Sequence, residues 1–425
     1  MEYMSNLLKT LAWVGAVLLI ATIIGIGEIK APSQLTLDAQ NKPQSAVKPQ
    51  DNLPVPVTIE TNNLELGWEA PSVVVGADGA PMISYQDSNS LKLVKCADNS
   101  CVSHTLQAID PVEANKTRYM PSQTSISVGK DGFPIIAYDA DFYIKIAKCN
   151  DSLCSSPTVH VLDPMGGGID SASSIVVTSD GLPLVSYHYM DKEGQLKLRV
   201  AKCVDISCSA TSIHDLDTKG TFAGKSSVIA IGADGLPVIS YYNSDHLKFI
   251  RCDDISCASS TIRDRDFSLS VARHISMAIG KDGFPIIAYS DGMPFLENKD
   301  VKLLNHHSIN VLKCGDPSCV LTKTSIPIVT KNSEQNGALG GSIAISIGTN
   351  GLPFIVDNEN GALRLARCDD TSCTSATTLT LDSIGDTYLY SASIAMGRDD
   401  LPFIAYFDSA NNAIRYIHCN TYCTK

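Results

Sequence analysis

Residues 129–138 read GKDGFPIIAY, and the same ten letters recur at residues 280–289. Identity over ten residues at two distant places indicates an internal repeat. Five diverged copies keep the same order: a short apolar run, a turn that is Asp-Gly or Asn-Gly in all but one of them, a proline two residues after the glycine position, and a second apolar run that usually ends in tyrosine. The first apolar runs of the seven copies occupy residues 72–76, 125–129, 174–178, 228–232, 276–280, 344–348 and 393–397.

Each copy is predicted to form four antiparallel strands. The apolar runs alternate bulky and small side chains with a period of two, as half-buried strands do. Asp-Gly supplies the positive φ angles of a hairpin turn, and the proline opens the second strand, where its missing N–H is tolerated. Only the seventh copy departs, with Asp400 at the glycine position. Calcium binding is an alternative role for the turn aspartates, but turn chemistry accounts for them without a metal, so we expect neither a metal nor a cofactor.

A third strand in each copy ends at a cysteine, and a fourth follows a second cysteine. Zinc would need two such pairs to converge on one metal, and seven pairs cannot all be matched two by two. We therefore predict seven local disulfides and an oxidising compartment. The predicted bonds join Cys96 with Cys101, Cys149 with Cys154, Cys203 with Cys208, Cys252 with Cys257, Cys314 with Cys319, Cys368 with Cys373, and Cys419 with Cys423.

The ends of the chain favour a closed ring over an open solenoid or a pair of sandwiches. The seventh copy ends with its cysteine hairpin and lacks a fourth strand, while residues 55–61 (VPVTIET) form a strand-like run that belongs to no copy. If this run completes the last sheet, no strand edge is exposed. We predict an all-β, seven-bladed β-propeller of four-stranded antiparallel blades over residues 55–425, closed by an N-terminal strand.

The residues before the propeller indicate export. Residues 11–26 (LAWVGAVLLIATIIGI) form an uncharged apolar run, intermediate in length between a signal-peptide core and a membrane span. We assign residues 1–30 to a signal peptide or transmembrane anchor, with an uncleaved anchor preferred and a buried core helix as a further alternative. Residues 31–54 are rich in Pro and Gln and are predicted to be a disordered linker. The domain would then lie at the cell surface, anchored or secreted.

Strand direction sorts the connections onto two ends of the ring. The Asp-Gly turns and cysteine hairpins lie at one end, which we call the turn end. The second-to-third loops and the blade-to-blade loops lie at the other, which we call the variable end. Because the variable end differs most between copies, a ligand surface is expected there, on a rigid scaffold.

Two sets of side chains are candidates for that surface. The recurrent acids of the fourth strands are Asp110, Asp163, Asp217, Asp266 and Asp382, with Thr330 at this position in the fifth copy. The tyrosines that end the second strands are Tyr85, Tyr138, Tyr187, Tyr241, Tyr289 and Tyr406. A structural role is the alternative for both: tyrosines packed between blades with a bonded hydroxyl, and acids that cap loops.

The fifth copy carries an insertion at the variable end, residues 290–310. As a loop it would expose Phe295 beside His306 and His307, which makes the three residues candidate contacts for a partner. No acid cluster nearby gives a metal-ligand spacing.

The repeat IGxDGxPxIxY…KC-x4-C resembles that of secreted bacterial β-propellers, and the whole pattern is distantly similar to sialidase-type and lectin propellers. The Asp-box S-x-D-x-G-x-x-W of sialidases is absent, and of the aromatic platforms that sugar-binding propellers use, only tyrosine can serve here. We expect a monomeric, non-catalytic module that binds glycan or protein at the cell surface. A sialidase-like glycoside hydrolase or a lyase is the first alternative, and a structural envelope protein is the second. A net charge of −12 disfavours nucleic acid.

Overall fold

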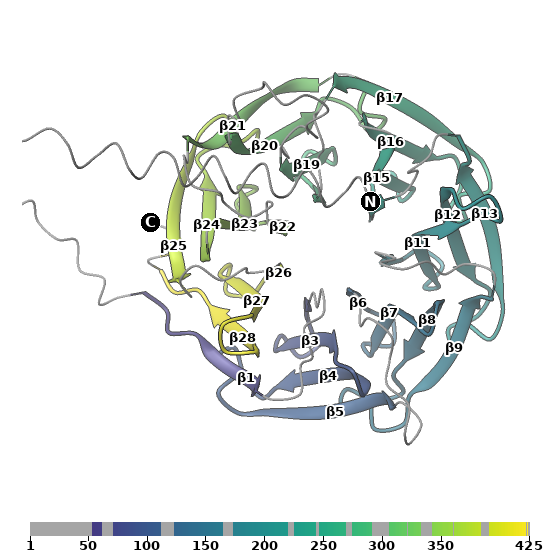
Figure 1. Ribbon diagram of the computed structural model, residues 1–425, viewed down its shortest axis with the longest axis horizontal. Helices are drawn as coiled ribbons and strands as arrows, with labels where there is room; N and C mark the ends of the chain where they lie inside the picture. The colour runs from purple at the N-terminus through teal and green to yellow at the C-terminus, as the bar shows by residue number, and fades with distance from the viewer. Residues whose placement is uncertain are drawn as a thin grey trace, which may run out of the picture. The chain divides into compact units, whose positions relative to one another are not determined.

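The computed structural model describes residues 53–61, 71–111, 123–164, 173–219, 225–243, 246–268, 274–290, 306–320, 322–332, 342–359, 361–383, 391–421 and 423. Its strands form seven four-stranded antiparallel sheets around a common axis (Figure 1), which confirms the predicted propeller. In each sheet the first strand is innermost and the fourth lies at the periphery. Among the described residues no helix is long and apolar enough to cross a bilayer, and the segment 11–26 lies outside them.

The blades follow chain order, with the last one completed by the first strand. Blades 1 and 2 consist of β2 (Ser72–Val75), β3 (Pro81–Gln86), β4 (Ser90–Cys96), β5 (His104–Pro111), and of β6 (Thr124–Val128), β7 (Pro134–Ala140), β8 (Tyr143–Lys148), β9 (Thr158–Asp163). Blades 3 and 4 consist of β10 (Ser173–Val177), β11 (Pro183–Met190), β12 (Leu196–Cys203), β13 (Thr211–Asp217), and of β14 (Lys225–Ile231), β15 (Pro237–Asn243), β16 (His246–Cys252), β17 (Ser260–Ser268). Blades 5 and 6 consist of β18 (Ile275–Ile279), β19 (Pro285–Ser290), β20 (His306–Cys314), β21 (Thr322–Asn332), and of β22 (Ile343–Ile347), β23 (Pro353–Glu359), β24 (Ala362–Cys368), β25 (Ala376–Ser383). Blade 7 consists of β26 (Ala392–Met396), β27 (Pro402–Asp408), β28 (Ala413–His418) and β1 (Val57–Thr61).

The ring closes as predicted. Strand β1 pairs antiparallel with β28, with Val57 opposite Tyr416 and Thr61 opposite Ala413. The N-terminal run therefore supplies the fourth strand that the seventh copy lacks and covers the edge that β28 would otherwise expose.

Apolar packing holds each blade to its neighbours. The described core residues form seven clusters, one at each blade junction. In the cluster between blades 2 and 3, Ile144 of β8 packs with Val185 and Tyr187 of β11. Because each sheet is sandwiched between two others, second strands such as β7 are buried along their whole length, whereas the outer strand β9 is half-exposed.

Serine hydrogen bonds between innermost strands add to this packing at five blade junctions. The Oγ of Ser72 accepts from the N–H of Ile126 in the next blade, and Ser125 does the same for Ile175. Ser174 and Ser276 repeat the contact, and Ser393 accepts from Val73 across the closure of the ring. The repeat's first residue is therefore serine in five copies because it joins adjacent blades.

All seven predicted disulfides are confirmed, six of them within a hairpin between third and fourth strands and the seventh just after β28. This many disulfides indicate an oxidising, extracellular environment. The bonds join Cys96 with Cys101, Cys149 with Cys154, Cys203 with Cys208, Cys252 with Cys257, Cys314 with Cys319, Cys368 with Cys373, and Cys419 with Cys423.

The backbone at the second cysteine of each pair is a feature that the sequence analysis did not predict. In the six C-x4-C hairpins this residue has a positive φ angle between 53° and 59°: Cys101, Cys154, Cys208, Cys257, Cys319 and Cys373. Its N–H donates to the carbonyl of an aspartate three residues earlier, as Cys101 does to Asp98 at 3.2 Å. Cys423, in the shorter C-x3-C hairpin, is not among the positive-φ residues. The six disulfides therefore hold a backbone conformation that residues with a side chain rarely adopt.

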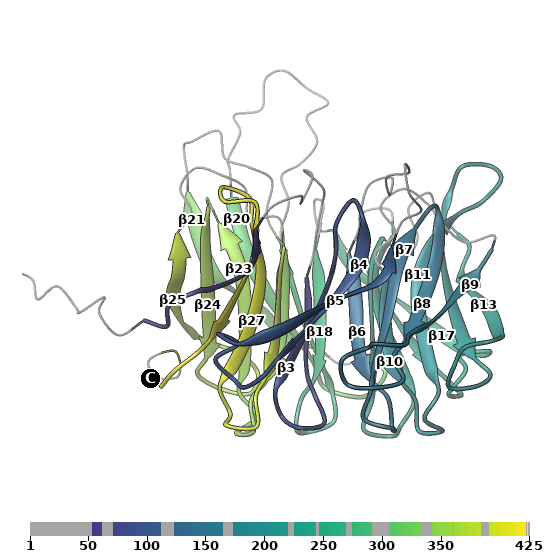
Figure 2. The ribbon, with the colours of Figure 1, turned by 90° about the horizontal axis from the view of Figure 1, so that it is seen from below.

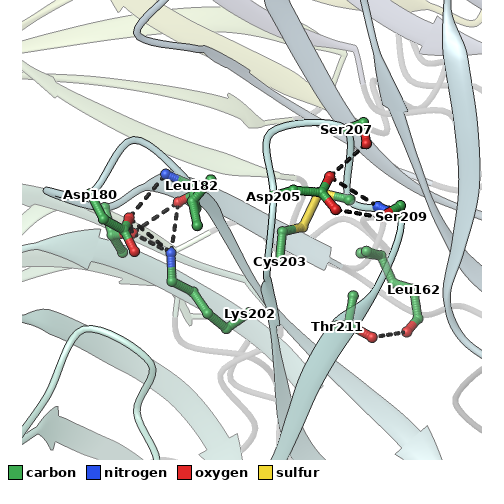
Figure 3. The surroundings of a disulfide bond; sticks show 11 residues. Leu162, Asp180, Leu182, Lys202, Cys203, Asp205, Ser207, Ser209 and Thr211 are labelled. Carbon is green, nitrogen blue, oxygen red and sulfur yellow. Dashed lines mark hydrogen bonds and ion pairs between the residues drawn. A yellow bond between two sulfur atoms is a disulfide. The ribbon is translucent and has the colours of Figure 1, made fainter.

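The turn aspartates have the expected local role and a second one. The Oδ1 of Asp180 accepts from the N–H of Leu182 at 3.0 Å, and Lys202, the residue before the cysteine, donates to the same oxygen at 3.0 Å (Figure 3). The turns and the cysteine hairpins lie at the same end of the ring, along the lower edge of Figure 2. In blades 1 to 5 an ion pair of this kind ties the turn to the third strand of the same blade.

One prediction about the insertion in the fifth copy is wrong. Strand β20 begins at His306, so His306 and His307 belong to a strand, opposite Asn332 and Lys331 of β21, and not to a loop. The long β21 provides backbone partners that extend this hairpin beyond those of the other blades. Phe295 lies outside the described residues, as do the side chains of His306 and His307.

Candidate functional site

The predicted tyrosines and acids meet in pairs across blade junctions. The hydroxyl of Tyr138 donates to Asp110 of the preceding blade at 2.8 Å. Tyr187 donates in the same way to Asp163 at 2.8 Å. The pairs Tyr241–Asp217 and Tyr406–Asp382 repeat this contact. In each case a cation from the third strand of the tyrosine's own blade binds the same acid: Lys145, Arg199, Lys248 and Arg415. We call each set of tyrosine, acid and cation a junction triad.

The closing strand supplies the acid of one further triad, which the sequence analysis missed. Glu60 of β1 accepts hydrogen bonds from the hydroxyl of Tyr85 and from Lys92, the latter at 2.7 Å. Lys92 also pairs with the buried Asp87 at 2.6 Å. The signal was present, because Glu60 lies in a fourth strand, as the recurrent acids do, but residues 55–61 were interpreted only as an edge to be paired.

Burial and contacts shift the pKa of triad groups such as Asp217 and Tyr187. Burial alone would raise the pKa of Asp217, but hydrogen bonds from the backbone of Lys219 and from Tyr241 and Asn243, together with the Lys248 charge, lower it. Burial and the neighbouring Asp163 raise the pKa of Tyr187, so this hydroxyl stays protonated and donates. These contacts give the tyrosines and acids a structural role at the blade junctions, and their ligand-binding role stays a prediction.

The junction of blades 5 and 6 departs from this pattern. Thr330 stands in place of the acid, and blade 6 has Asp357 where the other second strands have tyrosine. Asp357 forms a buried ion pair with Arg364 of the next strand. In blade 6 the acid and the cation therefore come from the same blade, and the cation is paired although no tyrosine is present. At the preceding junction Tyr289 is buried, while the side chain of Asp266 lies outside the described residues.

The variable end also presents an aromatic turn that the sequence analysis did not identify. Ala140 pairs with Tyr143, so Asp141 and Phe142 form a two-residue turn between β7 and β8. Both have positive φ angles, 57° and 67°. Glycine or asparagine normally fills such positions, because a bulky L-residue is strained there. In the corresponding turn of blade 6 the position of Phe142 is taken by Gly361, with φ 74°.

Phe142 and its neighbour are exposed. The exposed fractions are 53% for Phe142 and 41% for Tyr143. Met190, which ends β11 in the next blade, is 44% exposed. Tyr189 packs against the same apolar cluster as Ile144, the residue after Tyr143. We use the name blade 2–3 patch for four exposed or half-buried side chains at the variable end of these two neighbouring blades: Phe142 and Tyr143 at the tip of the β7–β8 hairpin, and Tyr189 and Met190 at the end of β11.

Charged side chains frame this patch. The guanidinium of Arg199 lies 3.5 Å from the centre of the Tyr189 ring, a cation–π contact. Burial alone would lower the pKa of Arg199, but Asp215 and Asp163 raise it, so the side chain stays charged. Asp141 has a half-exposed carboxylate that pairs with Lys145 at 2.9 Å.

The turn end carries a shallow depression of about 580 Å³ between blades 7 and 1. Its polar groups take part in local contacts: Arg398 donates to the carbonyl of Ala77, and His418 pairs with Asp399 at 2.9 Å. In the part of the chain that the structure describes, no three His, Cys, Asp or Glu side chains converge to hold a metal ion.

No protein-family model matches this chain, and no curated protein matches it either. Solved structures of similar fold include the lectin BP39L from Burkholderia pseudomallei, 12% identical with a TM-score of 0.57 over 83% of this chain and 97% of the lectin. They also include a GH93 α-L-arabinofuranosidase of Fusarium graminearum in complex with arabinobiose, 13% identical with a TM-score of 0.50 over 87% and 98%. The NanB sialidase from Streptococcus pneumoniae is 10% identical with a TM-score of 0.48 over 89% and 72%. The distant similarity to a lectin propeller is confirmed as a likeness of fold.

Proposed function

We propose that this chain is a non-catalytic, cell-surface recognition module that binds glycans through the variable end of its propeller. The observation that carries the proposal is the turn of Asp141 and Phe142, where a bulky aromatic is held in a strained conformation and exposed to solvent. Strain of this kind persists where it serves a function. An exposed ring beside polar groups suits a sugar, which has apolar faces and hydroxyl edges.

The engaged state of the junction acids supports binding rather than catalysis. A glycosidase needs a carboxyl group that exchanges a proton and a second carboxylate placed against the sugar. Asp110, Asp163, Asp217 and Asp382 instead accept hydrogen bonds from tyrosine and ion pairs from lysine or arginine. The lectin of similar fold is consistent with this role, although the arabinofuranosidase shares the fold too.

The proposed location follows from the disulfides together with the N-terminal apolar run. Seven hairpin disulfides require an oxidising compartment, and residues 11–26 are suited to hold the chain at a membrane. Residues 31–54 would then separate the monomeric propeller from the bilayer.

A glycan array probed with the full chain tests the function, and hydrolysis of chromogenic glycosides by the same preparation tests the absence of catalysis. Saturable binding to at least one glycan class without turnover is the expected result. Silence on every glycan would refute glycan recognition, and turnover of any glycoside would refute the non-catalytic assignment.

A further inference from the structure

Building on the proposed glycan recognition, we propose that the blade 2–3 patch binds a neutral sugar ring and discriminates against acidic sugars. The inference rests on the charges around Phe142, Tyr143, Tyr189 and Met190. An anionic sugar such as a uronic or sialic acid needs a cation that is available to its carboxylate. A neutral ring needs an apolar face to stack on and acceptors or donors for its hydroxyls.

The third strands of these two blades, β8 and β12, carry the cations Lys145 and Arg199, and both are already paired with carboxylates of the protein. Lys145, below the turn, pairs with Asp141 at 2.9 Å and with Asp110 at 3.4 Å. Its side chain is only 15% exposed, so a ligand would have to displace a protein carboxylate to reach it.

Arg199 has more contacts with protein groups than Lys145 has. It binds Asp163 at 2.8 Å and Asp215 at 2.5 Å, and its face is stacked on the Tyr189 ring. Two carboxylates on one guanidinium leave the site with a net negative charge. Asp215 is 42% exposed, so it would repel an acidic sugar that approached Arg199.

The loop of blade 3 adds no net charge. Lys197 is held by Asp191 at 3.7 Å and by the carbonyl of Thr218 at 2.7 Å. Lys192 is exposed, but it is followed directly by the equally exposed Glu193, so their charges offset each other.

The same groups suit a neutral ring. Phe142 and Tyr143 provide half-exposed aromatic surface at the tip of a hairpin. The carboxylate of Asp141 is 51% exposed and can accept hydrogen bonds from sugar hydroxyls while it keeps its pair with Lys145. Charge complementarity therefore selects a neutral hexose or pentose unit as the ligand.

The test compares neutral and acidic polysaccharides on the full chain. Affinity is measured by biolayer interferometry for galactan, arabinan, laminarin and mannan as neutral probes, and for polygalacturonate, hyaluronate and polysialate as acidic ones. We expect at least one neutral probe to bind at least tenfold more tightly than every acidic probe. Phe142→Gly and Tyr143→Ala should each weaken that binding about tenfold or more, whereas Leu153→Ala, an exposed apolar side chain at the turn end of the same blade, should leave it unchanged.

A charge variant tests the selectivity independently of the platform. Asp141→Asn keeps a residue that tolerates positive φ and releases Lys145 from one partner, so binding of polygalacturonate should rise several-fold. Acidic probes that bind the native chain as tightly as neutral ones would overturn this inference and leave glycan recognition standing. Neutral binding that survives both Phe142→Gly and Tyr143→Ala would overturn the site. Absence of binding to all seven probes and to the wider array would refute the proposed function, and this inference with it.

Discussion

Replacement of Phe142 by glycine measures two things separately. The change in unfolding free energy reports the strain of the aromatic turn, and the change in glycan affinity reports what the ring contributes to binding. Phe142 is 53% exposed, so about 100 Å² of ring surface is covered, and losing that burial costs about 2 kcal/mol of unfolding free energy. Glycine adds a further cost of about 0.5–1 kcal/mol through the entropy of the unfolded chain. Relief of the positive φ angle returns about 1–2 kcal/mol. We expect a net loss of about 1 kcal/mol, measured by chemical denaturation, together with the loss of glycan binding.

Tyr143→Gly is the matched control. Tyr143 is exposed to a similar extent, 41%, and is not among the positive-φ residues, so its loss of burial is not offset by released strain. Its expected cost is about 3 kcal/mol or more, roughly 2 kcal/mol beyond that of Phe142→Gly. Equal losses in the two variants would show that the turn stores no strain at Phe142, and the argument that the ring is kept there for a ligand would fail. Gly361→Ala in the matching turn of blade 6 should show the opposite effect, a loss of about 1 kcal/mol through introduced strain.

Three further outcomes follow from the contacts that hold the ring together. Tyr187→Phe removes the hydroxyl bond to the buried Asp163, and we expect a loss of about 1–3 kcal/mol in chemical denaturation with glycan affinity unchanged; a neutral effect would mean that the triads do not stabilise the junctions. The pKa of Asp217 is lowered in the folded state, so its stabilisation is present above the unfolded pKa of about 3.9 and is lost as pH falls through the folded value. Thermal melts from pH 7 to pH 3 should therefore show Asp217→Asn less stable than the native chain at pH 7, with the gap closing below about pH 4; a constant gap would contradict this. Replacement of Cys203 and Cys208 by serine removes a hairpin disulfide and should cost about 2 kcal/mol while the circular dichroism spectrum stays that of the native ring; unfolding of the whole domain would show that the disulfides are required for closure.

The repeat made the fold predictable because its signals are local and redundant. The Asp-Gly turns, the paired cysteines and the period-two strands each specify one blade, and seven copies remove the ambiguity of any single one. The closing strand could be inferred by counting the strands of each copy, since the seventh copy lacked a fourth strand and residues 55–61 belonged to no copy. The role of Glu60 in that strand could not, because it depends on which blade lies beside it in three dimensions.

The roles of the tyrosines and acids were predictable only as alternatives. Sequence places Asp163 and Tyr187 at the same end of the ring, but not at a hydrogen-bonding distance across a junction. That distance follows from the packing angle between blades, which no local pattern encodes. The junction of blades 5 and 6 shows that the partner depends on the neighbouring blade. Thr330 stands at the position of the acid, and Arg364 pairs with Asp357 of its own blade.

The aromatic turn was missed because a hairpin without glycine or asparagine gives no turn signal, and residues 139–143 (DADFY) contain neither. The comparison between blades shows why this matters for function. Gly361 closes an equivalent turn in blade 6, so the propeller does not need an aromatic there. Asp400 and the hairpin cysteines, which also have positive φ angles, take part in contacts that hold the fold together. Asp400 accepts a hydrogen bond from Thr349 of the preceding blade and so joins two blades, and hairpin cysteines such as Cys208 are held by their disulfides. Phe142 presents about half of its surface to solvent. Seven blade junctions stabilise the ring, so the scaffold can tolerate one strained turn that presents an aromatic side chain to solvent.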